Sequence, residues 1–164
     1  GKMEFGARAL GNRSILASAK NAKMREKLNH VIKKREGFRP FAPSVLEEQK
    51  DWFGVVETSP FMNLVSYIRG VGRQGHVIPF PAATHINRTA RVQTVNKTQN
   101  LKFYKLLSEI KRREGVGVLL NTSYNLKDQT ITMTPKQAIE RYLSSDIDFL
   151  VINNFLIKKH ATKR

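Results

Sequence analysis

The stretch that decides the fold class is Val116-Gly-Val-Leu-Leu-Asn-Thr-Ser-Tyr-Asn125. It begins with a short apolar run, which is typical of a buried strand. The residues before it predict a helix over residues 100–113, because apolar side chains recur there at helical spacing. The apolar face of this helix is formed by Phe103, Leu106, Leu107 and Ile110.

The residues after this stretch predict a second helix and a second strand. Thr134 followed by Pro135 is typical of a helix start, with Thr as the N-cap and Pro at the first helical position. Residues 149–152 form another apolar run, predicted to be a buried strand. Strand, loop, helix and strand in this order predict an α/β unit with a parallel or mixed sheet. The core face of the second helix is predicted to be Ala138, Ile139, Tyr142 and Leu143.

The N-terminal half predicts less regular elements. Met24, Leu28, Val31 and Ile32 have helical spacing, so residues 21–35 are predicted to be a helix. Asn21 is its expected N-cap and Gly37 its expected end. The other predictions are a short strand or pocket edge at 14–17, stiff extended segments at 38–46 and 78–83, strands at 64–68 and 89–95, and a glycine loop at 70–75.

Length and composition exclude several classes of protein. The chain has 164 residues, which predicts one domain, and its hydrophobic fraction of 40% is too high for a disordered tail. The absence of Cys excludes disulfides, thiolate zinc sites and a cysteine nucleophile. The sequence has no apolar run long enough to span a bilayer and no signal-peptide pattern, so we expect a cytoplasmic protein.

The charge points to an anionic partner. Lys and Arg number 29 against 13 Asp and Glu, a net charge of +16, which favours nucleic acid, acidic lipid headgroups or phosphorylated metabolites. The basic runs at 33–35, 111–113 and the C-terminal tail are interpreted mainly as solvated surfaces. Four arginines differ, because they lie among small and apolar residues and need a carboxylate or phosphate partner: Arg8, Arg13, Arg39 and Arg91.

Three segments are candidates for chemistry. After the strand that begins at Val116, the side chains of Asn121, Thr122, Ser123 and Asn125 are suited to cradling phosphate oxygens, or they form an ordinary polar turn. Two prolines, Pro40 and Pro43, follow Arg39 in the segment 38–44. This arginine is either a preorganised anion clamp or is stacked on a neighbouring Phe.

The third segment is residues 84–94. If it is a strand, Thr89, Arg91 and Gln93 share one face and suit a phosphorylated or ureido-like ligand. His85 is either a base, a hydrogen-bond donor or a structural residue. The four histidines show no metal-ligand spacing, and the sequence contains no Walker loop or dinucleotide fingerprint.

Four motifs together resemble the C-terminal domain of the O-carbamoyltransferase family, which includes the nodulation protein NodU and the carbamoyltransferases of cephamycin and tobramycin biosynthesis. The resemblance extends from about residue 2 to residue 158. The motifs are Phe5-Gly-Ala-Arg-Ala-Leu-Gly-Asn-Arg-Ser-Ile-Leu16, Lys33-x-Arg-Glu-x-Phe-Arg-Pro-Phe-Ala-Pro-Ser44, Thr84-His85 with Thr89-Ala-Arg-Val-Gln-Thr94, and Leu120-Asn-Thr-Ser-Tyr-Asn125.

This resemblance implies a YrdC-like twisted mixed sheet, flanked by helices around a basic cavity, over residues 1–160, with a basic tail at 161–164. In the family this domain takes carbamoyl phosphate and ATP (with Mg) and forms carbamoyl-adenylate. An N-terminal domain related to actin and heat-shock proteins, which lies outside this sequence, then passes the carbamoyl group to a substrate hydroxyl. The resemblance implies Lys33, Arg91 and Ser123 as catalytic residues. The wider set expected to bind carbamoyl phosphate and ATP adds Arg8, Arg13, Arg39, Thr89, Gln93, Asn121 and Thr122; no metal ligand is expected in this domain.

The chain departs from the family pattern at residues 127–130, where Lys-Asp-Gln-Thr replaces the usual Lys-Gly-Glu-Pro. A carboxylate is therefore shifted or lost, which weakens any role for it in binding Mg-ATP. Two alternatives remain open at this point. One is a basic RNA-binding module, although nucleic acid and membrane are not the expected partners. The other is a silent domain that only docks on the missing part.

Overall fold

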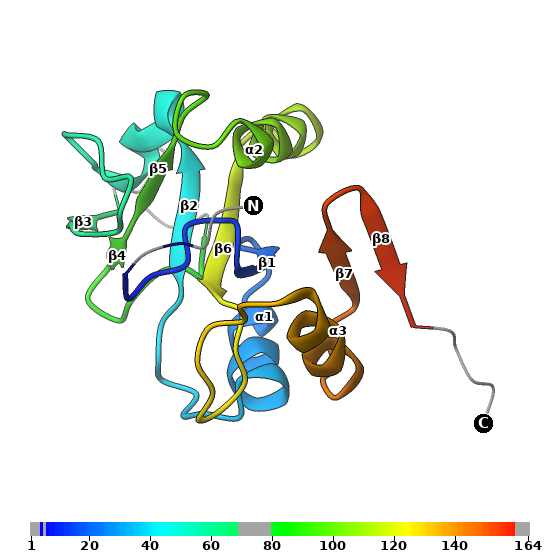
Figure 1. The fold of residues 1–164 in the computed structure, drawn as a ribbon. Coiled ribbons are helices and arrows are strands. Elements are labelled where there is room, and N and C mark those ends of the chain that lie inside the picture. Colours follow the sequence, from blue (N-terminus) through cyan, green and yellow to red (C-terminus); the bar gives the residue numbers. More distant parts are fainter. Residues whose placement is uncertain (1–3, 5, 69–79, 160–164) are drawn as a thin grey trace.

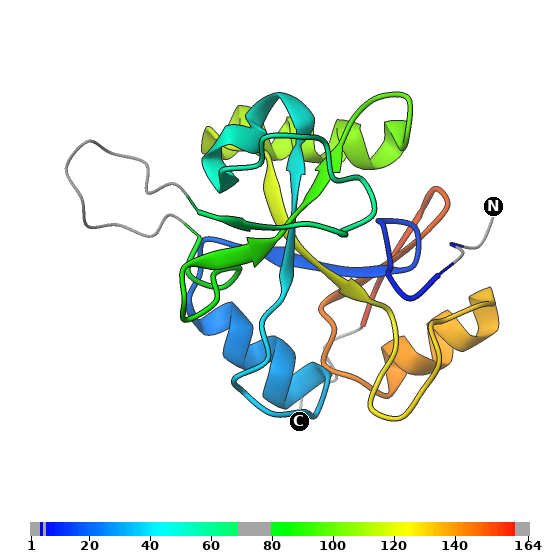
Figure 2. The same ribbon diagram turned by 90° about the vertical axis from the view of Figure 1, so that its left-hand side faces the viewer.

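The computed structural model describes residue 4, residues 6–68 and residues 80–159. A mixed four-stranded sheet in the order β1-β6-β2-β5 forms its centre (Figures 1 and 2). β6 (Val118–Ser123) is antiparallel to both β1 (Ser14–Ser18) and β2 (Ala42–Leu46), whereas β2 is parallel to β5 (Gln93–Val95). The predicted mixed sheet is therefore confirmed.

The strand β2 is buried along its whole length, although it contains a proline. Pro43 pairs with Leu120 of β6, and the pairing of β2 with β5 begins only at Ser44. The missing N–H of Pro43 therefore lies before the parallel ladder begins, which is how a central strand tolerates this residue. The core behind β2 includes the stacked rings of Phe53 and Phe80, whose centroids are 5.0 Å apart. Phe53 belongs to the 3-10 helix η2 (Glu47–Phe53).

Two helices begin where the sequence predicts them. In α2 (Leu101–Glu114), the Asn100 side chain accepts a hydrogen bond from the N–H of Phe103. In α3 (Pro135–Leu143), Thr134 accepts one from Gln137. The predicted apolar faces are only partly buried, because Phe103, Leu107, Ala138 and Tyr142 enter the core, whereas Leu106, Ile139 and Leu143 are exposed. Residues 111–113 are exposed at the end of α2, as expected.

The N-terminal helix is shorter than predicted and ends in a different way. It consists of α1 (Lys23–Glu26) followed by a π-helical segment, η1 (Lys27–Ile32). Asn21 accepts a hydrogen bond from Lys23 N–H, but the N-cap position is Ala22. Gly37 does not end the helix, because the chain leaves it after Ile32 and turns at Lys34, whose φ is +49°. Val31, expected in the core, is exposed.

The segment predicted as one strand at 89–95 is split in two. β4 (Thr89–Arg91) pairs with β3 (Val65–Tyr67), whereas β5 pairs with β2 of the main sheet. The change of partner occurs at Val92. The predicted extended segment 78–83 is also wrong over its described part, because residues 80–83 form a turn closed by a hydrogen bond from Ala83 N–H to the Phe80 carbonyl. The glycine loop 70–75 and the tail 161–164 lie outside the described residues.

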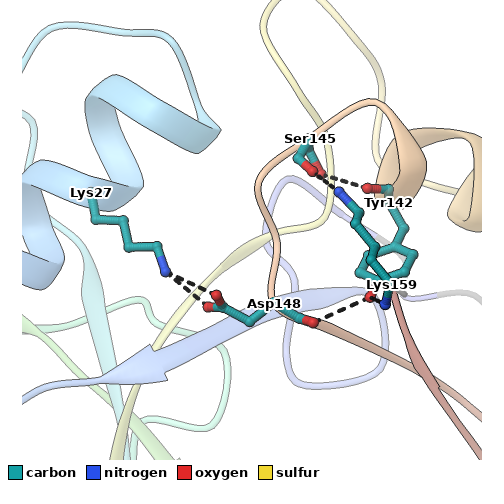
Figure 3. A network of polar contacts seen from close by, with 5 residues as sticks. All are labelled: Lys27, Tyr142, Ser145, Asp148 and Lys159. Carbon is teal, nitrogen blue, oxygen red and sulfur yellow. Dashed lines mark hydrogen bonds and ion pairs between the residues drawn. The ribbon is translucent and has the colours of Figure 1, made fainter. Parts of the chain in front are cut away.

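The strand predicted at 149–152 exists as β7 (Phe149–Ile152), but it pairs with β8 (Phe155–Lys158) outside the main sheet and is largely exposed. Figure 3 shows how this ribbon is attached. Lys27 of η1 forms an ion pair with Asp148 at 2.9 Å. The Tyr142 hydroxyl donates to the Asp148 carbonyl and accepts from Lys159 N–H, so α3 holds both ends of the ribbon.

Candidate functional site

A cavity of about 660 Å³ lies between β6, the end of η1 and the β3–β4 pair. Its volume is in the range of small-molecule sites. Most of its charged lining residues are cationic, and only Glu36 and Asp128 are acidic. The cationic residues that line it are Arg8, Lys33, Lys34, Arg35, Arg39, Arg91 and Lys127.

Arg91 reaches the cavity from β4, where it lies opposite Val65 of β3. Its Nε is buried and has no hydrogen-bond partner among the described residues. Burial lowers the pKa of Arg91, and the nearby charge of Arg8 lowers it further. Two like charges beside each other favour an anion between them.

Lys33 reaches the cavity because the π-helical turn brings its N–H to the Leu28 carbonyl at 2.8 Å. Lys33 is only 5% exposed. The ammonium donates to the carbonyl oxygens of Ser123 (2.6 Å) and Asn125 (2.9 Å) and to Asn125 Oδ1 (2.8 Å). Burial is the main cause that lowers its pKa to about 7, and the charges of Arg35, Arg39 and Arg141 add to it. Lys33 therefore holds the end of β6 against η1 without any carboxylate partner among the described residues.

Arg35 and Arg39 lie on the same side of the cavity and are held differently. Arg35 donates from Nε to Asn29 Oδ1 at 2.7 Å, and its guanidinium lies 4.6 Å from the centre of the Phe41 ring. Arg39 forms a 3.9 Å ion pair with Glu36 and is half exposed. The arginine that stacks on a phenylalanine is thus Arg35, whereas the sequence favoured Arg39 for stacking or clamping.

The polar residues 121–123 form the last part of β6, whereas the sequence analysis placed them after the strand. Asn121 is buried and donates from Nδ2 to Ser44 Oγ (3.1 Å) and Gln93 Oε1 (2.9 Å). Its Oδ1 has no partner among the described residues. This oxygen is inaccessible to solvent and is therefore a buried acceptor that the described residues leave unsatisfied.

The structure brings most of the predicted site residues together, but not all. Arg8, Lys33, Arg39, Arg91, Asn121, Thr122 and Ser123 line the cavity. Three predicted residues are not among those lining it. Arg13 lies on the loop before β1. Gln93 is hydrogen-bonded to Ser44 Oγ and to the Leu10 carbonyl. Thr89 contacts His85 and Asn87. The strand break at Val92 is the reason that Thr89, Arg91 and Gln93 do not present one common surface.

Asn125, a candidate from the sequence, lines the cavity, whereas Arg35 lines it without having been predicted as part of the site. The interpretation of the run 33–35 as mainly a solvated surface is wrong for Lys33, because the helix ends at Ile32 and Lys33 is buried. The available signal was that Arg35 lies within the motif of residues 33–44, one of the four on which the family resemblance rests. In the described part of the chain, no group of three or more Asp, Glu or His residues is arranged to hold a metal ion. None of the helices described there is long and apolar enough to cross a membrane.

Comparison with known proteins matches residues 1–159 to the family described as carbamoyltransferase C-terminus. The nodulation protein NolNO of Sinorhizobium fredii is 43% identical over 98% of this chain and 24% of its own length. The 3'-hydroxymethylcephem-O-carbamoyltransferase of Streptomyces clavuligerus is 41% identical over 76% of this chain and 23% of its own length. Nodulation protein U of S. fredii is 40% identical over 76% of this chain and 22% of its own length. The chain thus spans about a quarter of the length of these relatives.

Proposed function

Because the chain belongs to the carbamoyltransferase C-terminus family, we propose that its cavity binds carbamoyl phosphate and ATP and prepares the carbamoyl group for transfer to a hydroxyl. The observation that supports this most is the convergence of cations from distant parts of the sequence. Arg8, Arg35 and Arg91 line one cavity and have no ion-pair partner among the described residues. An unpaired cluster of this kind is costly unless an anion occupies it.

The proposed chemistry has two steps in a YrdC-like domain. Carbamoyl phosphate reacts with water and gives carbamate and phosphate; carbamate then attacks the α-phosphorus of ATP and gives carbamoyl-adenylate and pyrophosphate. Both steps release negatively charged leaving groups, which the fixed charges of Arg39 and Arg91 stabilise. Carbamate decomposes in water, so its retention in the cavity until it reacts with ATP has a chemical purpose.

Each residue has a distinct part in this proposal. Arg91, Arg8 and Arg39 contact phosphoryl or carbamoyl oxygens, and the Ser123 hydroxyl donates a hydrogen bond to them. Lys33 contributes charge and, through its bonds to Ser123 and Asn125, holds the end of β6 in place. Mg²⁺ would arrive with ATP. Asp128 and Glu36 are the carboxylates that line the cavity, and they suit one water-mediated contact better than a set of direct ligands.

Transfer itself is proposed to need another domain. The relatives are about four times longer than this chain, so a preceding domain has room to bind the hydroxyl acceptor and complete the reaction. Pyrophosphate release by the longer protein, measured with and without acceptor, tests this division of labour. We expect release of pyrophosphate without acceptor and product only when both domains are present.

Calorimetry with carbamoyl phosphate on the 164-residue chain tests the proposed site. We expect Arg91→Met to weaken binding at least tenfold, because it removes a charge beside Arg8. The melting temperature should stay the same or rise, since like-charge repulsion is relieved. Lys105→Met, which removes an exposed charge from α2, is the matched control and should bind as the parent does. Equal loss of affinity in both variants would mean that only the net charge matters.

A further inference from the structure

His85 is a titratable side chain of the cavity lining that the proposed chemistry does not use. It lies in the loop just before β4, which two backbone hydrogen bonds close. His85 N–H donates to the Thr89 carbonyl at 2.8 Å, and Arg88 N–H donates to the His85 carbonyl at 3.0 Å. The imidazole is therefore attached to a short, internally bonded loop next to Arg91, and its position is well defined.

The hydrogen bonds around Thr89 fix the tautomer of His85. The Thr89 hydroxyl donates to Asn87 Oδ1 at 2.7 Å, and Thr89 N–H donates to the same oxygen at 3.3 Å. A hydroxyl has one hydrogen, so Thr89 Oγ1 can only accept from His85 Nδ1, which lies 3.0 Å away. Nδ1 therefore holds the proton, and Nε2 of the neutral ring has a free lone pair.

The surroundings keep the ring in this neutral form. Burial lowers the pKa of His85, and the charge of Arg91 lowers it further. The charged form is thus disfavoured at neutral pH. Nδ1 is committed to Thr89, so Nε2 is the nitrogen available to a ligand in the cavity.

His85 Nε2 is an uncharged acceptor in a cavity whose charged side chains are mostly donors. Guanidinium and ammonium groups have no acceptor capacity, and they suit the oxygens of a phosphate. A carbamoyl group differs from an acetyl group by an NH₂ in place of a methyl group, and that NH₂ needs acceptors. His85 Nε2, which has no hydrogen-bond partner among the described residues and belongs to a residue of the cavity lining, supplies one of them.

We propose that His85 Nε2 accepts a hydrogen bond from the ligand's NH₂ group and thereby selects carbamoyl phosphate over acetyl phosphate, with Thr89 as the positioning residue that sets the tautomer. This inference rests on the proposed function, since it assumes that an acyl phosphate occupies the cavity. It adds a specificity residue to the cationic site and identifies what distinguishes the substrate from a closely similar acyl phosphate.

Titration calorimetry of the 164-residue chain with carbamoyl phosphate, acetyl phosphate and inorganic phosphate tests the proposal. We expect the parent to bind carbamoyl phosphate roughly tenfold more tightly than acetyl phosphate, the effect of about one hydrogen bond made or left unpaired. His85→Asn keeps a donor near the Nδ1 position but loses the distal acceptor, so the preference should disappear while phosphate affinity is unchanged. His85→Gln places an amide oxygen near the Nε2 position and should retain part of the preference.

Nitrogen-15 NMR of the imidazole ring gives a second readout that needs no ligand. We expect the Nδ1–H tautomer in the parent and a mixture of tautomers in Thr89→Val. A parent ring in the Nε2–H form would overturn the inference, as would equal affinity of the parent for the two acyl phosphates. Failure of all three compounds to bind would instead overturn the proposed function, and the inference with it, so the two failures are distinguishable.

Discussion

Lys33 is an ammonium enclosed by neutral oxygens, and this has a consequence for stability. Its pKa is lowered from 10.5 to about 7 in the folded chain, chiefly by burial. Between these two values the unfolded chain binds more protons at this site than the folded chain, so the free energy of unfolding rises with pH across that window. Below the folded pKa the lysine is charged in both states, and the full cost of burying the charge is present.

Lys33→Met removes this dependence. We expect the stability of the parent relative to Lys33→Met to increase by at least about 1 kcal/mol between pH 7 and about pH 9.5, because one pKa unit corresponds to about 1.4 kcal/mol. Urea denaturation at the two pH values measures it. Lys105→Met, which lacks an exposed lysine, should have the same change in stability as the parent between the two pH values. A stability difference between parent and Lys33→Met that stays constant with pH would contradict the buried-charge interpretation.

Side-chain environment is the part of the site that the sequence predicted least well. Arg35 and Lys33 belong to a basic run whose sequence is compatible both with a continuing helix and with a chain that leaves the helix. The burial of Lys33 depends on its hydrogen bonds to Ser123 and Asn125, which lie about 90 residues away in the sequence. The isolated arginines Arg8 and Arg91 were identifiable because their neighbours are small or apolar, which is a local signal.

The loop between β6 and α3 departs from the family pattern, and its geometry limits what that departure changes. Asp128 stands at the usual glycine position and has φ +58°, a backbone conformation that Asp tolerates better than most residues. Gln129 stands at the usual glutamate position, and its Oε1 accepts from Leu126 N–H at 3.2 Å. A glutamate is able to accept the same bond, so the substitution preserves the turn and alters the charge. The new carboxylate, Asp128, lines the cavity.

Asp128 should therefore weaken anion binding by a small amount. We expect Asp128→Asn and Asp128→Gly to bind phosphate about two- to fivefold more tightly, because each removes an exposed negative charge near the cations. The free energy of unfolding should change by less than about 0.5 kcal/mol in both variants. Asn tolerates the same backbone conformation as Asp. In the Gly variant the relief of backbone strain is offset by the greater conformational entropy of the unfolded chain. Glu57→Gln removes an acid outside the cavity lining and serves as the control. Calorimetry in low salt measures the affinities; weaker binding in Asp128→Asn would assign the carboxylate a direct role with the ligand.

Elements with local signals were predicted well, and those defined by distant partners were not. The caps at Asn100 and Thr134 and the apolar spacing of α2 and α3 are contained within a few residues of sequence. The division of residues 89–95 into β4 and β5 depends on pairing with β3 and β2, which lie far away in the chain. Similarly, the apolar run 149–152 gives no indication that its partner is the next strand and that most of its side chains remain exposed.

At the scale of the whole molecule, a net charge of +16 needs anions, and the fold determines which anions bind tightly. An RNA duplex would contact cations spread over an open surface, and its affinity would fall steeply with salt. Here many of the described cations converge on a cavity of about 660 Å³, a space for a small molecule. The convergence leaves like charges close together in the free protein, so binding of a small polyvalent anion should stabilise the folded state.

We therefore expect inorganic phosphate, at millimolar concentration and constant ionic strength, to raise the melting temperature by several degrees relative to chloride. Differential scanning fluorimetry measures this, and Arg91→Met should lose most of the increment while Lys105→Met keeps it. Constant ionic strength separates site binding from general screening, because chloride screens surface charge as well as phosphate does at the same ionic strength. A short RNA duplex should neither reproduce the increment nor prevent phosphate from producing it. If RNA raises the melting temperature and phosphate does not, the cations act as an open surface, and the metabolite site proposed for this cavity is wrong.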